Sequence, residues 1–526
     1  MQIARFPLTS LQFTDRIIAD YLQKSPALIS FISDFPSEDA FQNVIEQRRF
    51  PINNRLILAD ELTLQYHSLS QETATRDAIE KLRSERTFTV TTGHQLCLFT
   101  GPMYFIFKII STIKLAETLR IKFPEFNFVP VYWMASEDHD FEEINHVWIQ
   151  GKKIEWTNNS GGAVGRLPLK GLESLLHEFE SLLPESSSKE EWMASLRTSF
   201  SKQTLSEAIQ NLVHSLFGEK GLLVLNPDSP ALKRLFAPTM RTELTENKGD
   251  TRVSAATQEL QNLGYKTLVH ARAINLFYLG ENYRGRIEKN ESTWTVVSQD
   301  KQWNESELQN ELTQHPENFS PNVAMRPLYQ ETILPNIAYV GGPGEISYWM
   351  QFKSNFDYYN TPFPLLILRD SALILNARQK SKLQKTGLDL SKLFLSRNEQ
   401  VASILPIADT EVQEEKNTLS AVYDELRTKA KAIDPTLEAF VNAEKQKQLL
   451  ALENVEKKMS KALKQREEVK IQQLDKILDE LFPNGKLNER RDNIFPLLNE
   501  FGSDLLNELH DHFDPIQGEL KVLQED

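Results

Sequence analysis

The stretch from Phe88 to Gly101, which reads F-T-V-T-T-G-H-Q-L-C-L-F-T-G, decides the fold class. Its first part, F-T-V-T-T, is β-branched or aromatic and predicts a buried strand that Gly93 ends. Pro102 then opens an apolar-periodic segment that reaches Leu119 and predicts a helix with proline in its first turn. Strand, turn and helix form the first half of a βαβ unit, so we expect an α/β protein with a Rossmann-like core.

The residues of the turn lie where open α/β sheets bind nucleotides and phosphates, at the carboxyl end of a strand and before a helix. Gly93, His94 and Gln95 are therefore candidates for nucleotide binding. An imidazole at this point can contact phosphate oxygens and stabilise charge that develops during phosphoryl or nucleotidyl transfer, which makes His94 a catalytic candidate. The alternative is that His94 only caps the helix.

Length and composition bound the class of protein. A chain of 526 residues is too long for one ordinary core, so we expect several domains. The net charge of -14 argues against a general nucleic-acid binder. A single cysteine excludes an internal disulfide framework and suits a reducing cytoplasm. The sequence has no apolar run of membrane-spanning length and no signal peptide at its start, so we expect a cytoplasmic protein.

A second strand-like run, Phe126 to Met134, is followed at once by an acidic loop, A-S-E-D-H-D-F-E-E-I. Loops at the carboxyl ends of strands carry function, so we expect Glu137, Asp138 and Asp140 to bind a substrate ammonium. His139 is a candidate general base for an amine nucleophile. The loop lacks a diagnostic metal spacing, and we predict no metal ligands. The alternative is a charged loop that is only solvated and binds no ligand.

Composition shifts divide the chain into a core, two insertions and a helical end. The core begins in residues 1–150, which include a helical N-terminal preface. It is expected to return in a strand at 221–230 and to finish in 321–390. Residues 151–220 and 231–320 are predicted insertions, the second with a small antiparallel sheet. Residues 391–526 are predicted to form a helical coiled-coil dimerisation domain with a long helix from Pro435 to Leu481, although a coil that packs only on its own core is an alternative.

A glycine-rich turn and a basic run mark the end of the core. Gly341, Gly342 and Gly344 allow a backbone to approach a ligand closely, and we assign them to nucleotide binding. The nearby Arg326 and Tyr339 are candidates for substrate binding. Lys380 and Lys382 lie in a basic helical stretch and are further candidates for nucleotide binding, with an exposed helix face as the alternative.

Cys97 follows His94 by three positions and is a tempting nucleophile. Its neighbours Leu96, Leu98 and Phe99 are apolar, and a free cysteine in apolar company is more often a small core residue. We therefore expect Cys97 to pack and not to react.

Three long motifs together resemble one family. They are T-T-G-H-Q-L-C-L-F-T-G-P-M-Y, then P-V-Y-W-M-A-S-E-D-H-D-F-E-E-I, then R-P-L-Y-Q-E-T-I-L-P-N-I-A-Y-V-G-G-P-G-E-I-S-Y-W. In order and spacing they resemble the cysteine-adding enzymes of bacillithiol biosynthesis, the BshC family, over essentially the whole chain.

The resemblance implies a Rossmann-like core with two inserted connecting segments and a C-terminal coiled coil that makes a homodimer. It also implies a ligase that joins cysteine through its carboxyl group to the amine of glucosaminyl malate. ATP is the expected source of activation, with Mg²⁺ as its companion ion. By a looser analogy with class I aminoacyl-tRNA synthetases, Gly93-His94 stands at a phosphate-binding motif and Lys380 to Lys382 at a second, lysine-containing motif.

Two alternatives belong to other classes. In the first, the protein is a dimeric scaffold that holds a nucleotide without turning it over. In the second, it is a nucleotidyltransferase that acts on another small acid. No nucleic acid or membrane is expected as a partner in any of the three readings.

Overall fold

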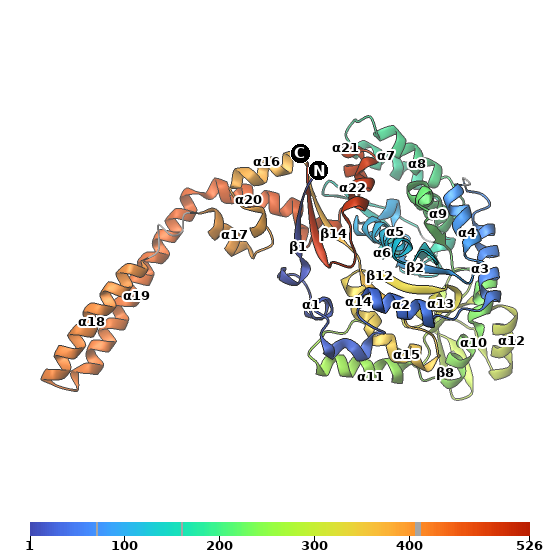
Figure 1. The fold of residues 1–526 in the computed structure, drawn as a ribbon, viewed down its shortest axis with the longest axis horizontal. Coiled ribbons are helices and arrows are strands. Elements are labelled where there is room, and N and C mark those ends of the chain that lie inside the picture. Colours follow the sequence, from blue (N-terminus) through green and yellow to red (C-terminus); the bar gives the residue numbers. More distant parts are fainter. Residues whose placement is uncertain (70–71, 159–160, 406–411, 526) are drawn as a thin grey trace. The chain divides into compact units, whose positions relative to one another are not determined.

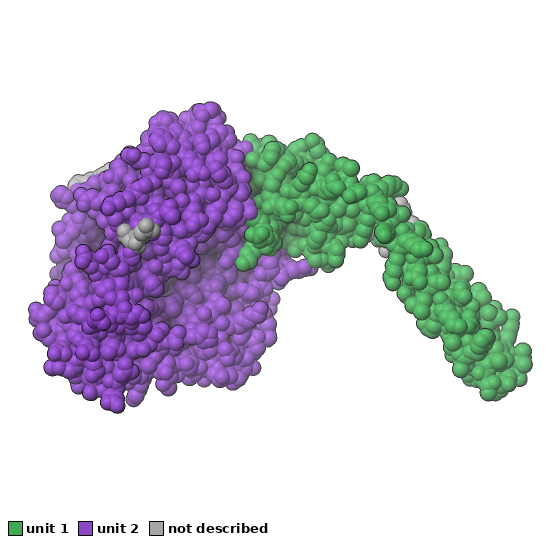
Figure 2. Space-filling view, turned by 180° about the vertical axis from the view of Figure 1, so that it is seen from behind, with its two compact units in different colours: residues 1–2, 374–486, 523–526 green, residues 3–373, 487–522 purple. Residues whose placement is uncertain are grey.

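The computed structural model describes residues 1–69, 72–158, 161–405 and 412–525. It contains two compact units (Figure 2). Unit 1 comprises residues 1–2, 374–486 and 523–526, and unit 2 comprises residues 3–373 and 487–522. Among the described residues, none of the helices is both long and apolar enough to cross a membrane.

Unit 2 is organised on a five-stranded parallel sheet with the order β13-β12-β2-β3-β6, of which β2 and β12 are labelled in Figure 1. Its strands are β2 (Thr87–His94), β3 (Asn127–Met134), β6 (Leu223–Leu225), β12 (Asn336–Gly341) and β13 (Leu365–Leu368). The chain moves outward from β2 to β6 and then returns to the other side of β2, so the strand order reverses between β2 and β12. The predicted Rossmann-like α/β class is confirmed, and this reversal is where such sheets bind ligands.

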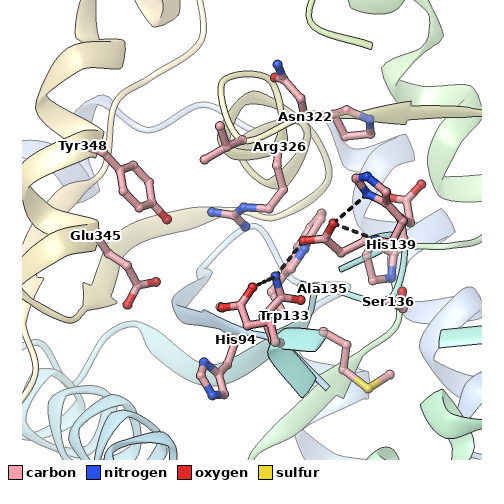
Figure 3. Close-up of a pocket in the computed structure, with 18 of the residues that line it drawn as sticks. His94, Trp133, Ala135, Ser136, His139, Asn322, Arg326, Glu345 and Tyr348 are labelled. Carbon is pink, nitrogen blue, oxygen red and sulfur yellow. Dashed lines mark hydrogen bonds and ion pairs between the residues drawn. The ribbon is translucent and has the colours of Figure 1, made fainter. Parts of the chain in front are cut away.

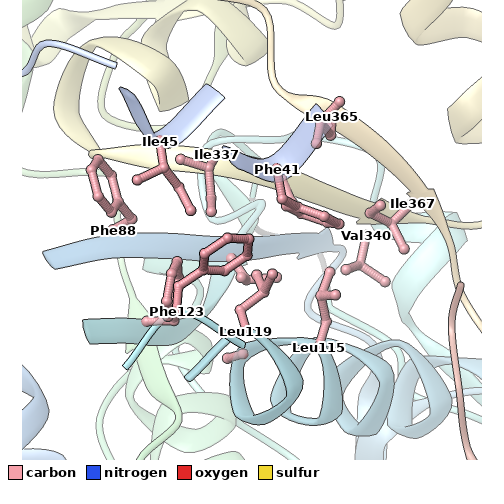
Figure 4. Packing of buried hydrophobic residues seen from close by; sticks show 14 of the residues in the cluster. Phe41, Ile45, Phe88, Leu115, Leu119, Phe123, Ile337, Val340, Leu365 and Ile367 are labelled. Carbon is pink, nitrogen blue, oxygen red and sulfur yellow. The ribbon is translucent and has the colours of Figure 1, made fainter. Parts of the chain in front are cut away.

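Helices cover both faces of the sheet (Figure 4). Leu115 and Leu119 of α5 (Tyr104–Lys122) pack on one face, and Phe41 and Ile45 of α2 (Glu38–Gln47) pack on the other. Each fully buried leucine or phenylalanine contributes roughly 1.5–3 kcal/mol. Since α5 follows directly from the turn after β2, this packing fixes the carboxyl end of β2 in place.

The other helices of unit 2 surround this core. Those before β12 are α1 (Arg16–Leu22), α3 (Ile52–Gln65), α4 (Thr73–Lys81), α6 (Phe141–Ile144), α7 (Leu172–Leu182), α8 (Lys189–Ser199), α9 (Leu205–Phe217), α10 (Pro230–Glu246), α11 (Gly249–Asn262), α12 (Glu305–Gln314) and α13 (Arg326–Ile333). Those after β12 are α14 (Pro343–Trp349), α15 (Lys353–Tyr358), α21 (Phe495–Phe501) and α22 (Asp504–His512).

A second five-stranded sheet is antiparallel, with the order β10-β9-β8-β7-β11. Its strands are β7 (Leu276–Leu279), β8 (Arg284–Asn290), β9 (Thr293–Val296), β10 (Gln302–Trp303) and β11 (Phe319–Pro321). A hairpin of β4 (His146–Ile149) and β5 (Lys152–Glu155) follows the acidic loop.

A three-stranded sheet with the order β1-β15-β14 is absent from the sequence interpretation. Its strands are β1 (Gln2–Pro7), β14 (Ser371–Leu375) and β15 (Glu519–Gln524). The preface was expected to be mostly helical, but β1 pairs with a strand from the other end of the chain. A short strand whose partner lies some 500 positions away carries no local signal.

Unit 1 contains α16 (Ala377–Thr386), α17 (Arg397–Ile404), α18 (Gln413–Ile433), α19 (Leu437–Arg466) and α20 (Glu468–Leu481). Helices α18 and α19 form the predicted coiled coil. Its ion pairs run Lys416–Glu456, Asp424–Lys445 and Lys431–Glu438, which is an antiparallel register around the turn at Asp434. The single helix expected from Pro435 to Leu481 is wrong. It breaks between Arg466 and Glu468, because no apolar residue continues the seam between Leu463 and Val469.

Candidate functional site

A cavity of about 750 Å³ opens at the carboxyl ends of β2, β3 and β12, where the strand order reverses (Figure 3). Its walls come from the turn after β2, the acidic loop after β3, the glycine turn after β12 and the antiparallel sheet. The predicted residues that line it are Gly93, His94, Gln95, Glu137, Asp138, His139, Arg326, Tyr339, Gly342 and Gly344. Motifs far apart in the sequence therefore meet at one site.

His94 forms the floor of the cavity at the end of β2 (Figure 3). Its ring stacks on Phe105 at 4.7 Å between centroids and meets the edge of Tyr104 at 5.3 Å. Burial, helped by the charges of Lys108 and Arg369, lowers the pKa of His94 well below its usual range. The ring is thus held as a neutral imidazole, which can donate one hydrogen bond but brings no positive charge.

We predict that His94 makes the protein less stable in mild acid. The pKa of His94 in the folded protein lies below its unfolded value near 6.5, so the unfolded chain takes up a proton first as the pH falls. The free energy of unfolding is therefore highest above pH 6.5 and decreases below it. Between pH 7.5 and 5.0 the wild type should lose on the order of 1 kcal/mol more unfolding free energy than His94→Gln, measured by urea titration. Equal losses in the two proteins would contradict a neutral buried His94.

Cys97 is buried, and its Sγ lies 3.8 Å from His94 Nε2. Burial and the nearby Glu143 carboxylate raise the pKa of the thiol to about 12. A thiol with so high a pKa is a poor nucleophile at neutral pH, which agrees with the packing role expected from its apolar neighbours.

Asp138 is the hub of the acidic loop. It accepts hydrogen bonds from Gln95 Nε2 at 2.6 Å and from Arg284 Nη1 at 3.1 Å. Burial opposes its ionisation, but the bonds from His139 and the Arg284 charge hold the pKa of Asp138 well below its usual range. Asp138 is therefore a carboxylate over the whole neutral range. Gln95 donates its amide N–H to this carboxylate, and its buried Oε1 has no partner within the described ranges. Gln95 therefore suits a donor such as an ammonium better than the phosphate predicted for it.

His139 lies at the exposed edge of the cavity beside Asp138. Its Nδ1 is 3.1 Å from Arg284 Nη1 and 3.3 Å from Asp138 Oδ1. A neutral ring with its proton on Nε2 accepts from Arg284, whereas a ring protonated on Nδ1 donates to Asp138. Nδ1 of His139 thus lies between a cationic donor and a carboxylate acceptor.

Glu137 does not point a free carboxylate at a ligand, although a substrate role was expected for it. It is buried and forms an ion pair with the fully buried Lys233 of α10, which also donates to the carbonyl of Phe319. Burial raises the pKa of Glu137 against the opposing charge of Lys233. The pair ties the acidic loop to α10 and β11, so Glu137 supports the wall of the cavity.

Glu345 in the glycine turn after β12 is a second ionised acid on the cavity. It pairs with the buried Lys108 of α5 at 2.7 Å, and it accepts from Tyr339 Oη at 2.6 Å and from the backbone N–H of Gly342 at 2.8 Å. Burial opposes ionisation, but Lys108 and these bonds keep the pKa of Glu345 below its usual range. Lys108 also donates to the carbonyl of Gly93, which joins the turns after β2 and β12.

Arg326 projects into the middle of the cavity (Figure 3). Its guanidinium carbon lies 5.7–5.9 Å from the ring centroids of Trp133, Tyr339 and Trp349. Nη1 donates to Gln330 Oε1 at 3.1 Å, and Nη2 is buried without a partner among the described residues. A Cβ on Gly93 would lie 3.2 Å from Tyr339 Oη, which is a tight contact, and 3.5 Å from Arg326 Nη1, which is an ordinary van der Waals contact.

Family models match nearly all of this chain. Residues 1–370 match the "Bacillithiol biosynthesis BshC, N-terminal Rossmann-like domain", and residues 372–525 match the "Bacillithiol biosynthesis BshC, C-terminal coiled-coil domain". The chain belongs to the BshC family. The resemblance inferred from the three sequence motifs is confirmed.

Similar proteins of the BshC family carry the name "Putative cysteine ligase BshC". The chain is 37% identical to those of Flavobacterium psychrophilum and Cytophaga hutchinsonii, with 97% and 98% of this chain and 97% of each relative covered. It is 32% identical to that of Salinibacter ruber over 96% of this chain and 95% of the relative. A solved structure described as a putative arginyl tRNA synthetase from Campylobacter jejuni covers 89% of this chain and 98% of its own, with a TM-score of 0.23 and 9% identity, so no argument rests on it.

Four predicted site residues do not line the cavity of this BshC family member. Asp140 caps α6 by accepting from the N–H of Glu143 at 3.2 Å, and Gly341 lies within β12. Lys380 and Lys382 belong to unit 1, where their ammonium groups donate to the carbonyl of Glu525 and to the carboxylate of Glu480. Both lysines therefore have hydrogen-bond partners within unit 1.

The cavity instead presents arginines that sequence reasoning missed: Arg272, Arg284, Arg286, Arg369 and Arg490. Arg369 follows β13, where it donates to Glu489 at 2.6 Å, and its buried Nε has no hydrogen-bond partner in the described part of the chain. Arg490 is exposed at the same wall. Only Arg369 had a usable signal, since it stands at the end of the apolar run P-L-L-I-L-R-D, residues 364–370, which is typical of a buried strand. No cluster of three or more histidine, cysteine or acidic residues that could hold a metal ion occurs in the part of the chain that the structure describes.

Proposed function

We propose that this protein joins cysteine, through its carboxyl group, to the amine of glucosaminyl malate, with ATP as the source of activation. One observation carries the proposal: ionised carboxylates and unpartnered arginine atoms face a single cavity at the strand-order reversal. The proposed substrates carry ammonium and carboxylate groups. The carboxylates of the cavity can bind the ammonium groups, and its arginines can bind the carboxylates. The relatives' name, putative cysteine ligase, and the family description, bacillithiol biosynthesis, support the coarser part of this proposal, a ligase that acts on cysteine.

An activated intermediate is required because a free carboxylate and an amine do not condense spontaneously in water. A carboxylate oxygen of cysteine attacks a phosphorus atom of ATP, and pyrophosphate or ADP leaves. The amine nitrogen then attacks the acyl carbon. AMP or phosphate departs with the bonding electron pair, and the amine gives up a proton.

The proposal assigns these steps to particular groups. Asp138 and Glu345 attract the ammonium groups, and Arg326 holds a carboxylate. His139 takes the proton from the amine. The neutral His94 donates to a phosphate oxygen, Arg369 and Arg490 neutralise phosphate charge, and Gly342 and Gly344 let the nucleotide approach the backbone. Mg²⁺ would arrive with the nucleotide.

The purified protein is expected to convert cysteine, glucosaminyl malate and ATP to the amide thiol, detected by mass spectrometry with AMP or ADP counted by chromatography. Cys97→Ser is the matched control, because its thiol is buried and plays no part in the reaction. It should keep wild-type turnover.

The same assay separates the alternatives. Product without dependence on ATP contradicts the activation step, and no product with any nucleotide contradicts the proposal. Pyrophosphate release with another acid in place of cysteine supports a nucleotidyltransferase. Nucleotide binding without turnover supports a scaffold.

We also propose that the coiled coil makes a homodimer. Apolar side chains of α18 and α19 are exposed, among them Val422, Leu426, Phe440 and Val455. Large exposed apolar residues along a helical seam are typical of an interaction surface. Since the reaction uses ATP and a free thiol, the proposal assigns the protein to the cytoplasm.

A further inference from the structure

A smaller recess of about 280 Å³ lies on the antiparallel sheet. It is formed by β8, by the segment before β7 and by Asn247 at the end of α10. Its lining residues with charged or amide side chains are Asn247, Arg272, Arg286, Glu288, Lys289 and Asn290.

The recess adjoins the main cavity. Arg272, Ile274 and Arg286 line both of them. The two arginines can therefore contact a ligand in either cavity.

The recess carries an excess of positive charge. Arg272, Arg286 and Lys289 line it with one acid, Glu288, which Arg286 Nη2 binds at 2.7 Å. Arg286 Nε is buried and has no hydrogen-bond partner among the described residues. A buried guanidinium N–H without a partner is costly, and an acceptor oxygen of a ligand would satisfy it.

The recess is also partly rigid. The carbonyl of Arg272 accepts from Asn275 Nδ2 at 2.7 Å, and its N–H donates to Asn275 Oδ1 at 2.9 Å, so the backbone that bears Arg272 is fixed. The guanidinium of Arg272 itself is exposed. A fixed backbone that carries an exposed guanidinium group suits a residue that recognises a ligand.

We propose that this recess binds the carboxylates of the acceptor substrate, and that Arg272 and Arg286 select an acceptor with an acidic tail. The inference rests on the proposed function. Glucosaminyl malate has an amine at one end and two carboxylates at the other. With the carboxylates between the recess arginines, the amine remains in the main cavity with Asp138 and Glu345.

The phosphates of ATP are the competing anions for this recess. They have other partners in the main cavity, which Arg369, Arg490 and His94 line; His94 ends β2 and Arg369 follows β13. Of the recess arginines, Arg286 belongs to β8 of the antiparallel sheet and Arg272 to the segment before β7. Two separate groups of cations fit two separate anionic ligands, which favours the acceptor carboxylates here.

Arg286→Ala and Arg272→Ala are expected to raise the apparent KM for glucosaminyl malate about tenfold or more while the KM for ATP and for cysteine stays within twofold. The preference for glucosaminyl malate over glucosamine, which has the same amine without the malate, should fall by a similar factor. Arg286→Lys should recover part of the loss. Arg234→Ala, at an exposed position of α10, is the matched control and should behave as wild type.

Calorimetry with malate alone and with ATP alone tests the recess without turnover, on variants whose melting temperatures match the wild type. Weaker malate binding with unchanged ATP binding in Arg286→Ala and Arg286→Lys supports the proposal. Weaker ATP binding with unchanged malate binding makes the recess a phosphate site and overturns it, and so does no change in either. If the wild type makes no amide but its malate binding depends on Arg286, the proposed function fails while the carboxylate site stands.

Discussion

Arg326→Ala is expected to lower kcat/KM for amide formation by about 100-fold or more, measured from initial rates at several cysteine concentrations. The guanidinium lies among Trp133, Tyr339 and Trp349, and its Nη2 has no partner among the described residues. A charge-assisted hydrogen bond to a substrate carboxylate in such a partly desolvated site is worth roughly 2–5 kcal/mol, and about 2.7 kcal/mol corresponds to a factor of 100.

The controls for this prediction separate chemistry from folding. Arg326→Lys keeps the charge but not the planar fork, so it should recover only part of the rate. Arg76→Ala, on the exposed side of α4, should have no effect. An Arg326→Ala enzyme within threefold of the wild type, correctly folded by circular dichroism, would remove Arg326 from the proposed mechanism.

Much of the parallel sheet could be predicted because its signals are local. The run F-T-V-T-T followed by Gly93 and Pro102 predicted β2 and α5, and the apolar run before the acidic loop predicted β3. Parallel strands end at one edge of a sheet, so the turn at His94, the loop at Asp138 and the turn at Gly342 can meet there. They do line one cavity.

The electrostatic partners inside that cavity could not be predicted, because they come from distant parts of the chain. Nothing local marks Lys108 as the partner of Glu345 or Glu489 as the partner of Arg369. The same limit applies to the ion pair of Glu137, for which only a substrate role was predicted. An acidic side chain after a strand looks free for a ligand until the fold brings Lys233 against it.

Lys233→Met is expected to destabilise the protein by about 3–5 kcal/mol, measured by denaturant unfolding at pH 8. Lys233 and Glu137 are both buried, and removal of one partner leaves a buried charge without its counter-ion. The vacated Glu137 can escape this cost only by taking up a proton, since the loss of Lys233 raises its pKa further.

The pH dependence and a double variant test this origin of the loss. A carboxyl group with a raised folded pKa gives stability that is present at low pH and lost as the pH rises. The deficit of Lys233→Met should therefore be smaller at pH 5 than at pH 8. Lys233→Met combined with Glu137→Gln removes both charges and should be more stable than Lys233→Met alone at pH 8, because a neutral amide costs less to bury than an unpaired carboxylate. A deficit that is independent of pH and unchanged in the double variant would mean that Lys233 stabilises α10 through packing and its bond to Phe319, and not through Glu137.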